Sequence, residues 1–133
     1  MNIASRLLAI GTSLVVAIAA AACSTGAASP PGTPVSLPPD APTIHVSASN
    51  RSSFDQSTLS APSGTAFAIV FENRDQGVPH DVAIKDASGT MLFQGDVISG
   101  PASRTYAVGP LPAGSYTFFC IVHQGMQGTL TIK

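Results

Sequence analysis

The sequence contains little charge, no tryptophan and only two cysteines. Charged residues make up 10% of its 133 residues, and six basic against seven acidic side chains leave a net charge of −1. A nucleic-acid surface needs clustered basic side chains, and no such cluster occurs here. Two cysteines are too few for a disulfide-stapled miniprotein, and 133 residues are too few for a large enzyme or a multi-span membrane protein. A single small domain that does not bind nucleic acid is therefore expected.

Glycine and proline are plentiful, with 12 and 11 residues, which favours turns and strands over a helical bundle. All eight aromatic residues lie at or after Phe54, so the first third of the chain differs in composition. There Arg6 precedes an apolar run over residues 7–22. As a helix this run spans about 24 Å, short of the roughly 30 Å of a membrane hydrocarbon core. A basic start, a short apolar stretch and a small-residue end predict a signal peptide over residues 1–22.

The signal peptide is followed by Cys23. The run Ala20-Ala21-Ala22-Cys23 resembles the bacterial lipobox, in which the cysteine is lipidated on sulfur and becomes the new N-terminus. The alternative is an ordinary Ala-x-Ala cleavage site with a cysteine beside it by chance. Six of the eleven prolines lie between Ser24 and Pro42, in a segment without aromatic residues that cannot bury enough surface to fold. We therefore expect residues 23–42 to be a lipid-anchored tether, and the protein to be secreted and held on the outer side of the cytoplasmic membrane.

Residues 43–133 are predicted to form the folded domain. Apolar and polar residues alternate there in short runs separated by Gly, Pro and Ser turns, which indicates strands. Over residues 80–85 this alternation predicts that His80 faces the core and Asp81 points away. The run Leu111–Tyr116 resembles a tyrosine corner, which ties a Greek-key crossover through the phenol oxygen. The expected fold is an all-β, Greek-key two-sheet sandwich of seven to eight strands.

Four side chains of this domain have the chemistry of a metal site. Cys120, His123 and Met126 follow the spacing Cys-x-x-His-x-x-Met, between a strand ending at Cys120 and the final strand of the chain. A tight loop there turns all three side chains toward one point. His80, on a separate strand, offers a second imidazole. Thiolate, imidazole and thioether together are the soft donor set that selects copper.

These residues make the domain resemble the cupredoxins, the small blue-copper proteins. The resemblance covers residues 43–133, and its ligand loop is the short version found in amicyanin. It implies one copper ion that cycles between Cu(II) and Cu(I), with His80, Cys120, His123 and Met126 as ligands. The matching segments are Asn73, Val78-Pro79-His80, Leu111–Tyr116 and Phe119–Met126.

Other interpretations of the same residues remain weaker. Zinc also binds cysteine and histidine, but structural zinc sites rarely use methionine. A cysteine nucleophile needs a base and an orienting group, and no substrate cleft is suggested. A Cys23–Cys120 disulfide is disfavoured, because it would join an unfolded tether to the core. Gln124 and Gln127 compete with Met126 as the axial ligand, because some family members use glutamine.

Three further residues are expected around the ligands without binding the metal: Asn73, Asp81 and Val122. Family members commonly have asparagine at the position of Asp81, where its side chain ties the two ligand loops together. A carboxylate there accepts hydrogen bonds but donates none, and its charge favours the oxidised site. Short-loop members often have proline at the position of Val122. Valine keeps a backbone N–H that can reach the Cys120 sulfur.

The resemblance implies a one-electron carrier rather than an enzyme. A multicopper enzyme needs further histidines, and only His45 remains, which the alternation places on the surface. The expected partner is a redox protein that docks near His123 on a patch formed by Val78, Pro79, Val122, Gly125 and Met126. A monomer is expected. The alternative function is copper buffering or delivery, against which the lack of further methionine or histidine clusters speaks.

Overall fold

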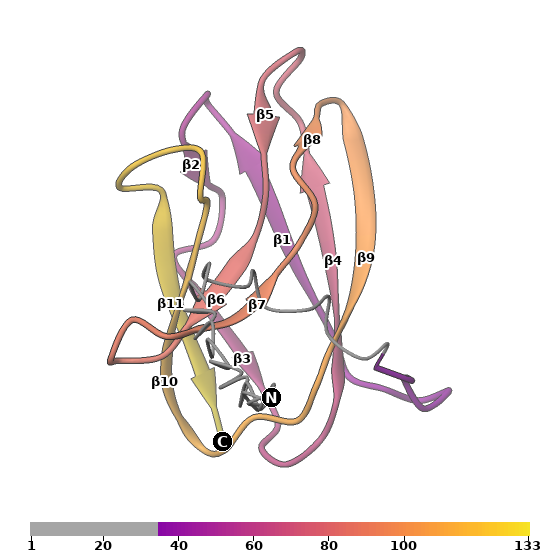
Figure 1. Ribbon diagram of the computed structural model, residues 1–133. Coiled ribbons are helices and arrows are strands. Elements are labelled where there is room, and N and C mark those ends of the chain that lie inside the picture. The colour runs from indigo at the N-terminus through magenta and orange to yellow at the C-terminus, as the bar shows by residue number, and fades with distance from the viewer. Residues whose placement is uncertain (1–34) are drawn as a thin grey trace, which may run out of the picture. The chain divides into compact units, whose positions relative to one another are not determined.

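The computed structural model describes residues 35–133, so the predicted signal peptide, Cys23 and most of the predicted tether lie outside the described residues. No helix in the described part is long and apolar enough to cross a membrane. The part of the chain from residue 35 onward holds eleven strands (Figure 1): β1 Thr43–Ser49, β2 Ser53–Phe54, β3 Thr58–Ala61, β4 Phe67–Asn73, β5 Pro79–His80, β6 Ala83–Lys85, β7 Met91–Gln94, β8 Ile98–Ser99, β9 Ala102–Val108, β10 Gly114–Phe119 and β11 Gln127–Ile132.

The strands form two main sheets. One has the order β2-β1-β4-β9, the other the order β3-β11-β10-β6-β7, and β5 pairs with β8 in a small ribbon. Parallel pairing joins β1 to β4 and β3 to β11, whereas the other paired strands are antiparallel. This arrangement confirms the predicted all-β two-sheet sandwich. Eight strands have three or more residues, and the remaining three are two-residue pairings too short for a sequence pattern to predict.

The core lies between the two sheets and follows the predicted alternation. Phe67 and Phe71 of β4, Phe118 of β10 and Leu130 of β11 are at most 1% exposed. Full burial of each such side chain contributes about 1.5–3 kcal/mol. Gly128 faces Phe118 across the β10–β11 pair, and a Cβ at this glycine would collide with the phenyl ring. The ring therefore fills the space that the glycine leaves.

A tyrosine corner is present where it was predicted. The Tyr116 hydroxyl donates a hydrogen bond to the Pro112 carbonyl at 2.8 Å. The bond fixes the loop that leads into β10. Because β10 ends immediately before Cys120, this corner also fixes the strand that carries the predicted cysteine ligand.

The alternation prediction is wrong at Asp81. Its side chain is fully buried, as is Ala83, although both were expected to point away from the core. The run does not form one continuous strand, because β5 ends at His80 and pairs with β8, while β6 begins at Ala83 and pairs with β10. The break between β5 and β6 turns Asp81 inward, toward the loop that follows β10.

Candidate metal centre

The structure brings the four predicted ligands to one end of the sandwich. His80 is the last residue of β5, and the other three lie in the loop between β10 and β11, at the end opposite the C-terminus (Figure 1). Within the loop, the Cys120 N–H donates to the Met126 carbonyl at 3.0 Å, and the Met126 N–H donates to the His123 carbonyl at 3.2 Å. Gly125 has a φ of +84°, a left-handed conformation that favours glycine. These features turn the loop tightly enough for its three side chains to converge.

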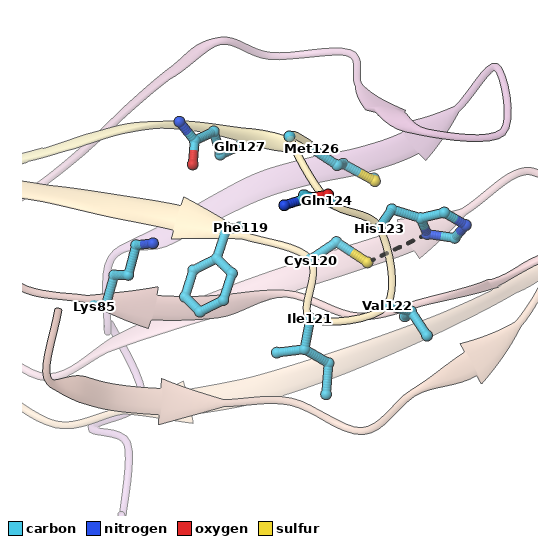
Figure 2. Close-up of a pocket in the computed structure, with 10 residues that line it drawn as sticks. Lys85, Phe119, Cys120, Ile121, Val122, His123, Gln124, Met126 and Gln127 are labelled. Atoms are coloured by element: carbon cyan, nitrogen blue, oxygen red, sulfur yellow. Dashed lines mark hydrogen bonds between the residues drawn. The ribbon is translucent and has the colours of Figure 1, made fainter.

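The nitrogen and sulfur atoms of the site are close together. The Cys120 Sγ lies 3.9 Å from His80 Nδ1 and 3.6 Å from His123 Nδ1, and the ligand atoms of these three residues all lie within 4.8 Å of one another. The two imidazole rings lie beside each other, with a centroid distance of 4.5 Å and a tilt of 41° between their planes. Figure 2 shows the Met126 sulfur pointing the same way as the Cys120 sulfur, toward the His123 ring. Two imidazoles, a thiol and a thioether facing one point are the donor set of a copper site.

Burial selects Met126 over the glutamines as the fourth ligand. The Met126 side chain is 2% exposed, whereas Gln124 and Gln127 are exposed. In Figure 2, Gln127 points away from the cluster. The same burial corrects the predicted docking patch, because Met126 lies beneath the surface. Ile121 and Val122 of the same loop are 43% and 45% exposed.

The Cys120 thiol does not ionise readily by itself, although a bound metal ion would deprotonate it. Burial raises its pKa, and this effect is partly offset by the backbone N–H groups of Asp81 and Val122. A coordinated metal cation deprotonates such a thiol outright. The same backbone N–H groups would then stabilise the thiolate.

Asp81 links the two ligand-bearing segments. One carboxylate oxygen, Oδ1, accepts the Ile121 N–H at 2.8 Å, so the residue after His80 is tied to the residue after Cys120. The other oxygen, Oδ2, is buried and has no hydrogen-bond partner among the described residues. Burial raises the pKa of Asp81, although the Ile121 N–H lowers it. A metal cation held by the adjacent ligands would compensate this buried carboxylate, so the residues present fit a copper ion.

Asn73 anchors the segment that leads into His80. Its amide nitrogen donates to the carbonyls of Val78 and Ile98 at 2.7 and 2.8 Å. Its oxygen accepts the Asp75 N–H at 3.0 Å. The side chain is fully buried, and its three bonds go to two segments: two to the β4–β5 connection and one to β8. It therefore fastens β4, the segment before β5, and β8 together.

The sequence prediction missed one residue at the site. The Asp75 Oδ2 lies 3.0 Å from His80 Nε2, the ring nitrogen that faces away from Cys120. An aspartate five residues before a predicted histidine ligand was the only available signal, and it does not indicate contact by itself. His45, by contrast, is exposed as expected.

The fold and the donor set define a small β-sandwich protein with a type 1 copper site, and copper is its cofactor. The chain belongs to the cupredoxin-like domain family, whose sequence profile matches residues 13–132. It is 37% identical over 90 residues to plastocyanin from Lactuca sativa, which covers 60% of this chain and 87% of the plastocyanin. A plastocyanin from Mercurialis perennis is 36% identical over the same shares of both chains.

Solved structures show the same fold. Auracyanin B superposes with a TM-score of 0.65 at 21% identity, over 77% of this chain and 96% of that one. Auracyanin A from Chloroflexus aurantiacus superposes with a TM-score of 0.60 at 17% identity, over 68% of this chain and 98% of that one. These similarities confirm the predicted sandwich.

Proposed function

We propose that the protein is a one-electron carrier that works outside the cytoplasm, anchored to the membrane through a lipid on Cys23, and that it is not an enzyme. The observation that carries this proposal is the convergence of two histidines, a cysteine and a methionine, three of whose ligand atoms lie within 4.8 Å of one another. When bound, copper supplies a one-electron exchange between Cu(II) and Cu(I). The plastocyanin relatives and auracyanin A, described as a "blue" copper protein, support the same role.

The residues around the site suit electron transfer because they keep the ligands fixed. Asp81 bridges the two ligand segments, and Asn73 anchors the segment before His80. A site that changes shape little between two oxidation states needs little reorganisation at each exchange. The strands and hydrogen bonds described above restrict such changes.

The surface beside His123 suits brief contact with a redox partner. His123 is partly exposed, and the neighbouring Ile121 and Val122 are 43% and 45% exposed. Pro79 is exposed on the adjacent segment. A small apolar surface of this kind favours weak, transient docking, as electron-transfer complexes require. We expect the partner to cover His123.

Copper loading tests the carrier role. The protein is loaded with Cu(II), and its visible and electron paramagnetic resonance spectra are recorded, with Cys120→Ser as the matched control. An intense thiolate-to-copper band with narrow hyperfine splitting is expected in the wild type only. Rapid loss of Cu(I) to a chelator, together with slow electron exchange, would favour copper delivery instead. A colourless wild-type protein would overturn the proposal.

The anchor is tested separately, in cells that express the full chain. The wild type should partition with the membrane fraction and carry lipid on Cys23. Cys23→Ala should release the protein or leave it unprocessed, because several acyl chains are needed for stable anchoring. A soluble wild-type protein with a free Cys23 thiol would refute the anchor and leave the copper site unaffected.

A further inference from the structure

The His80 imidazole is held at both ring nitrogens. Its Nδ1 faces the Cys120 sulfur, and its Nε2 lies 3.0 Å from the Asp75 Oδ2. The histidine is fully buried, and the Asp75 side chain is 15% exposed, so water screens this contact weakly. A carboxylate can only accept from this nitrogen, which places the ring proton on Nε2. The Nδ1 lone pair is then free to bind a metal.

A turn between β1 and β2 fixes the Asp75 carboxylate. Its Oδ2 also accepts the Arg51 N–H at 2.8 Å. Asn50 and Arg51 have φ values of 53° and 68°, a left-handed pair that occurs in tight hairpin turns. Arginine rarely adopts this conformation, so the turn carries local backbone strain. It lies at the same end of the sandwich as β5 (Figure 1).

The Asp75 charge is directed at the histidine rather than at a basic side chain. The neighbouring Arg74 guanidinium forms ion pairs with Asp55 and Glu72 instead. Among the described residues, Asp75 forms no ion pair with an arginine or lysine, and its side-chain partner is the His80 ring. The carboxylate therefore contacts the copper ligand without being neutralised by a direct ion pair.

We propose that Asp75 is a positioning residue for the copper site: it fixes the tautomer and orientation of His80 and lowers the reduction potential by favouring Cu(II). A carboxylate behind a metal-bound imidazole raises the basicity of that ligand. Its negative charge also stabilises the more positive oxidised site. Both effects strengthen Cu(II) binding more than Cu(I) binding. The inference rests on the proposed function only through the copper site and requires no particular partner.

Three variants distinguish the effect of the Asp75 charge, the effect of its hydrogen bonds and the effect of removing any charge at this end of the molecule. Asp75→Asn keeps an oxygen that accepts from Arg51 and His80 but removes the charge, whereas Asp75→Ala removes both. Asp55→Asn is the matched control, because it removes one charge from the same end of the molecule without touching a ligand. For each protein, chelator competition gives the Cu(II) and Cu(I) affinities, and voltammetry gives the potential.

Partners of metal-bound histidines typically contribute 10- to 100-fold to metal affinity. We expect Asp75→Asn to lower the ratio of Cu(II) to Cu(I) affinity about tenfold, which raises the potential by about 59 mV. Asp75→Ala should lower the ratio further, and Asp55→Asn should leave it unchanged. Imidazole nitrogen NMR of the metal-free wild type should show the His80 proton on Nε2.

A purely structural role would lower the unfolding midpoint of the metal-free protein but leave the affinity ratio unchanged. Wild-type ratios in both Asp75 variants would therefore overturn the inference, as would a His80 proton on Nδ1 in the metal-free protein. An equal change of the affinity ratio in Asp55→Asn would overturn it too, since removal of any negative charge at this end would then have the same effect. A wild type that binds no copper in a blue site would instead refute the proposed function.

Discussion

Val122 offers a direct test of how the backbone sets the copper potential. Proline at this position removes the N–H that is directed at the Cys120 sulfur, and it leaves all four ligands in place. Val122 has no left-handed backbone conformation, since the only non-glycine residues with positive φ in the described chain are Asn50 and Arg51. The side chain is 45% exposed, so a proline ring can be accommodated at the surface. We expect Val122→Pro to fold and to bind copper.

The expected shift follows from the donors around the sulfur. The backbone N–H groups of Asp81, Val122 and His123 each lower the pKa of the Cys120 thiol, as donors to its sulfur would. A hydrogen bond to a charged group contributes about 1.5–3 kcal/mol, of which only part differs between the two oxidation states. A difference of about 0.7–1 kcal/mol corresponds to about 30–45 mV for one electron. Removal of the donor returns charge to the Cu(II)–thiolate bond, so Val122→Pro should lower the potential.

Voltammetry on both proteins at one pH and one ionic strength measures the shift. Val122→Ala is the control, because it shortens the side chain but keeps the N–H, and it should retain the wild-type potential. An unchanged or raised potential in Val122→Pro, with the blue spectrum retained, would show that the Val122 N–H does not act on the sulfur. A shift of equal size in Val122→Ala would assign the effect to solvent access instead.

The remaining predictions concern the ligands, the core and a surface turn. Cys120→Ser should abolish the blue absorption band of the copper-loaded protein but keep the unfolding transition of the metal-free protein, because serine is nearly isosteric. Met126→Leu should keep the blue band and raise the potential measured by voltammetry, because loss of the axial donor disfavours Cu(II). Gly128→Ala should lower the free energy of unfolding in denaturant by about 1–3 kcal/mol, because the new Cβ overpacks the neighbouring phenyl ring. The Ser88 hydroxyl holds the pKa of Asp86 below its ordinary value of 3.8, so this carboxylate stabilises the fold above that pH and the contribution is lost as the pH falls through its lowered pKa. Asp86→Asn should therefore flatten the acid limb of the stability curve, measured by denaturant unfolding of the metal-free protein at several pH values.

Each of these predictions has a contrary outcome. Loss of the unfolding transition in Cys120→Ser would show that the thiol is needed for the fold. A colourless Met126→Leu protein would refute the axial assignment, and wild-type stability in Gly128→Ala would show that both the phenyl ring and the Ser57 carbonyl can move aside. An Asp86→Asn curve parallel to that of the wild type below pH 4 would remove Asp86 as a source of the acid dependence.

The sequence determined the features that depend on near neighbours. Period-two alternation is a property of each strand by itself, and it predicted the buried faces of β4, β10 and β11. The spacing of Cys120, His123 and Met126 is equally local, because one short loop carries all three. The tyrosine corner spans five residues from Pro112 to Tyr116, and its hydrogen bond formed as predicted.

Only the tertiary structure decided which distant segments meet. Strand alternation alone placed Asp81 at the surface, but the break between β5 and β6 places it in the interior against Ile121, 40 residues away along the chain. The burial of Met126 and the exposure of Ile121 depend on how the loop folds back on the sandwich. The contact between Asp75 and His80 depends in turn on the hairpin turn at Arg51. Residue type and spacing specify which groups can bind copper, whereas the hydrogen bonds and charges around that metal arise from strand pairing between remote parts of the chain, which no local pattern encodes.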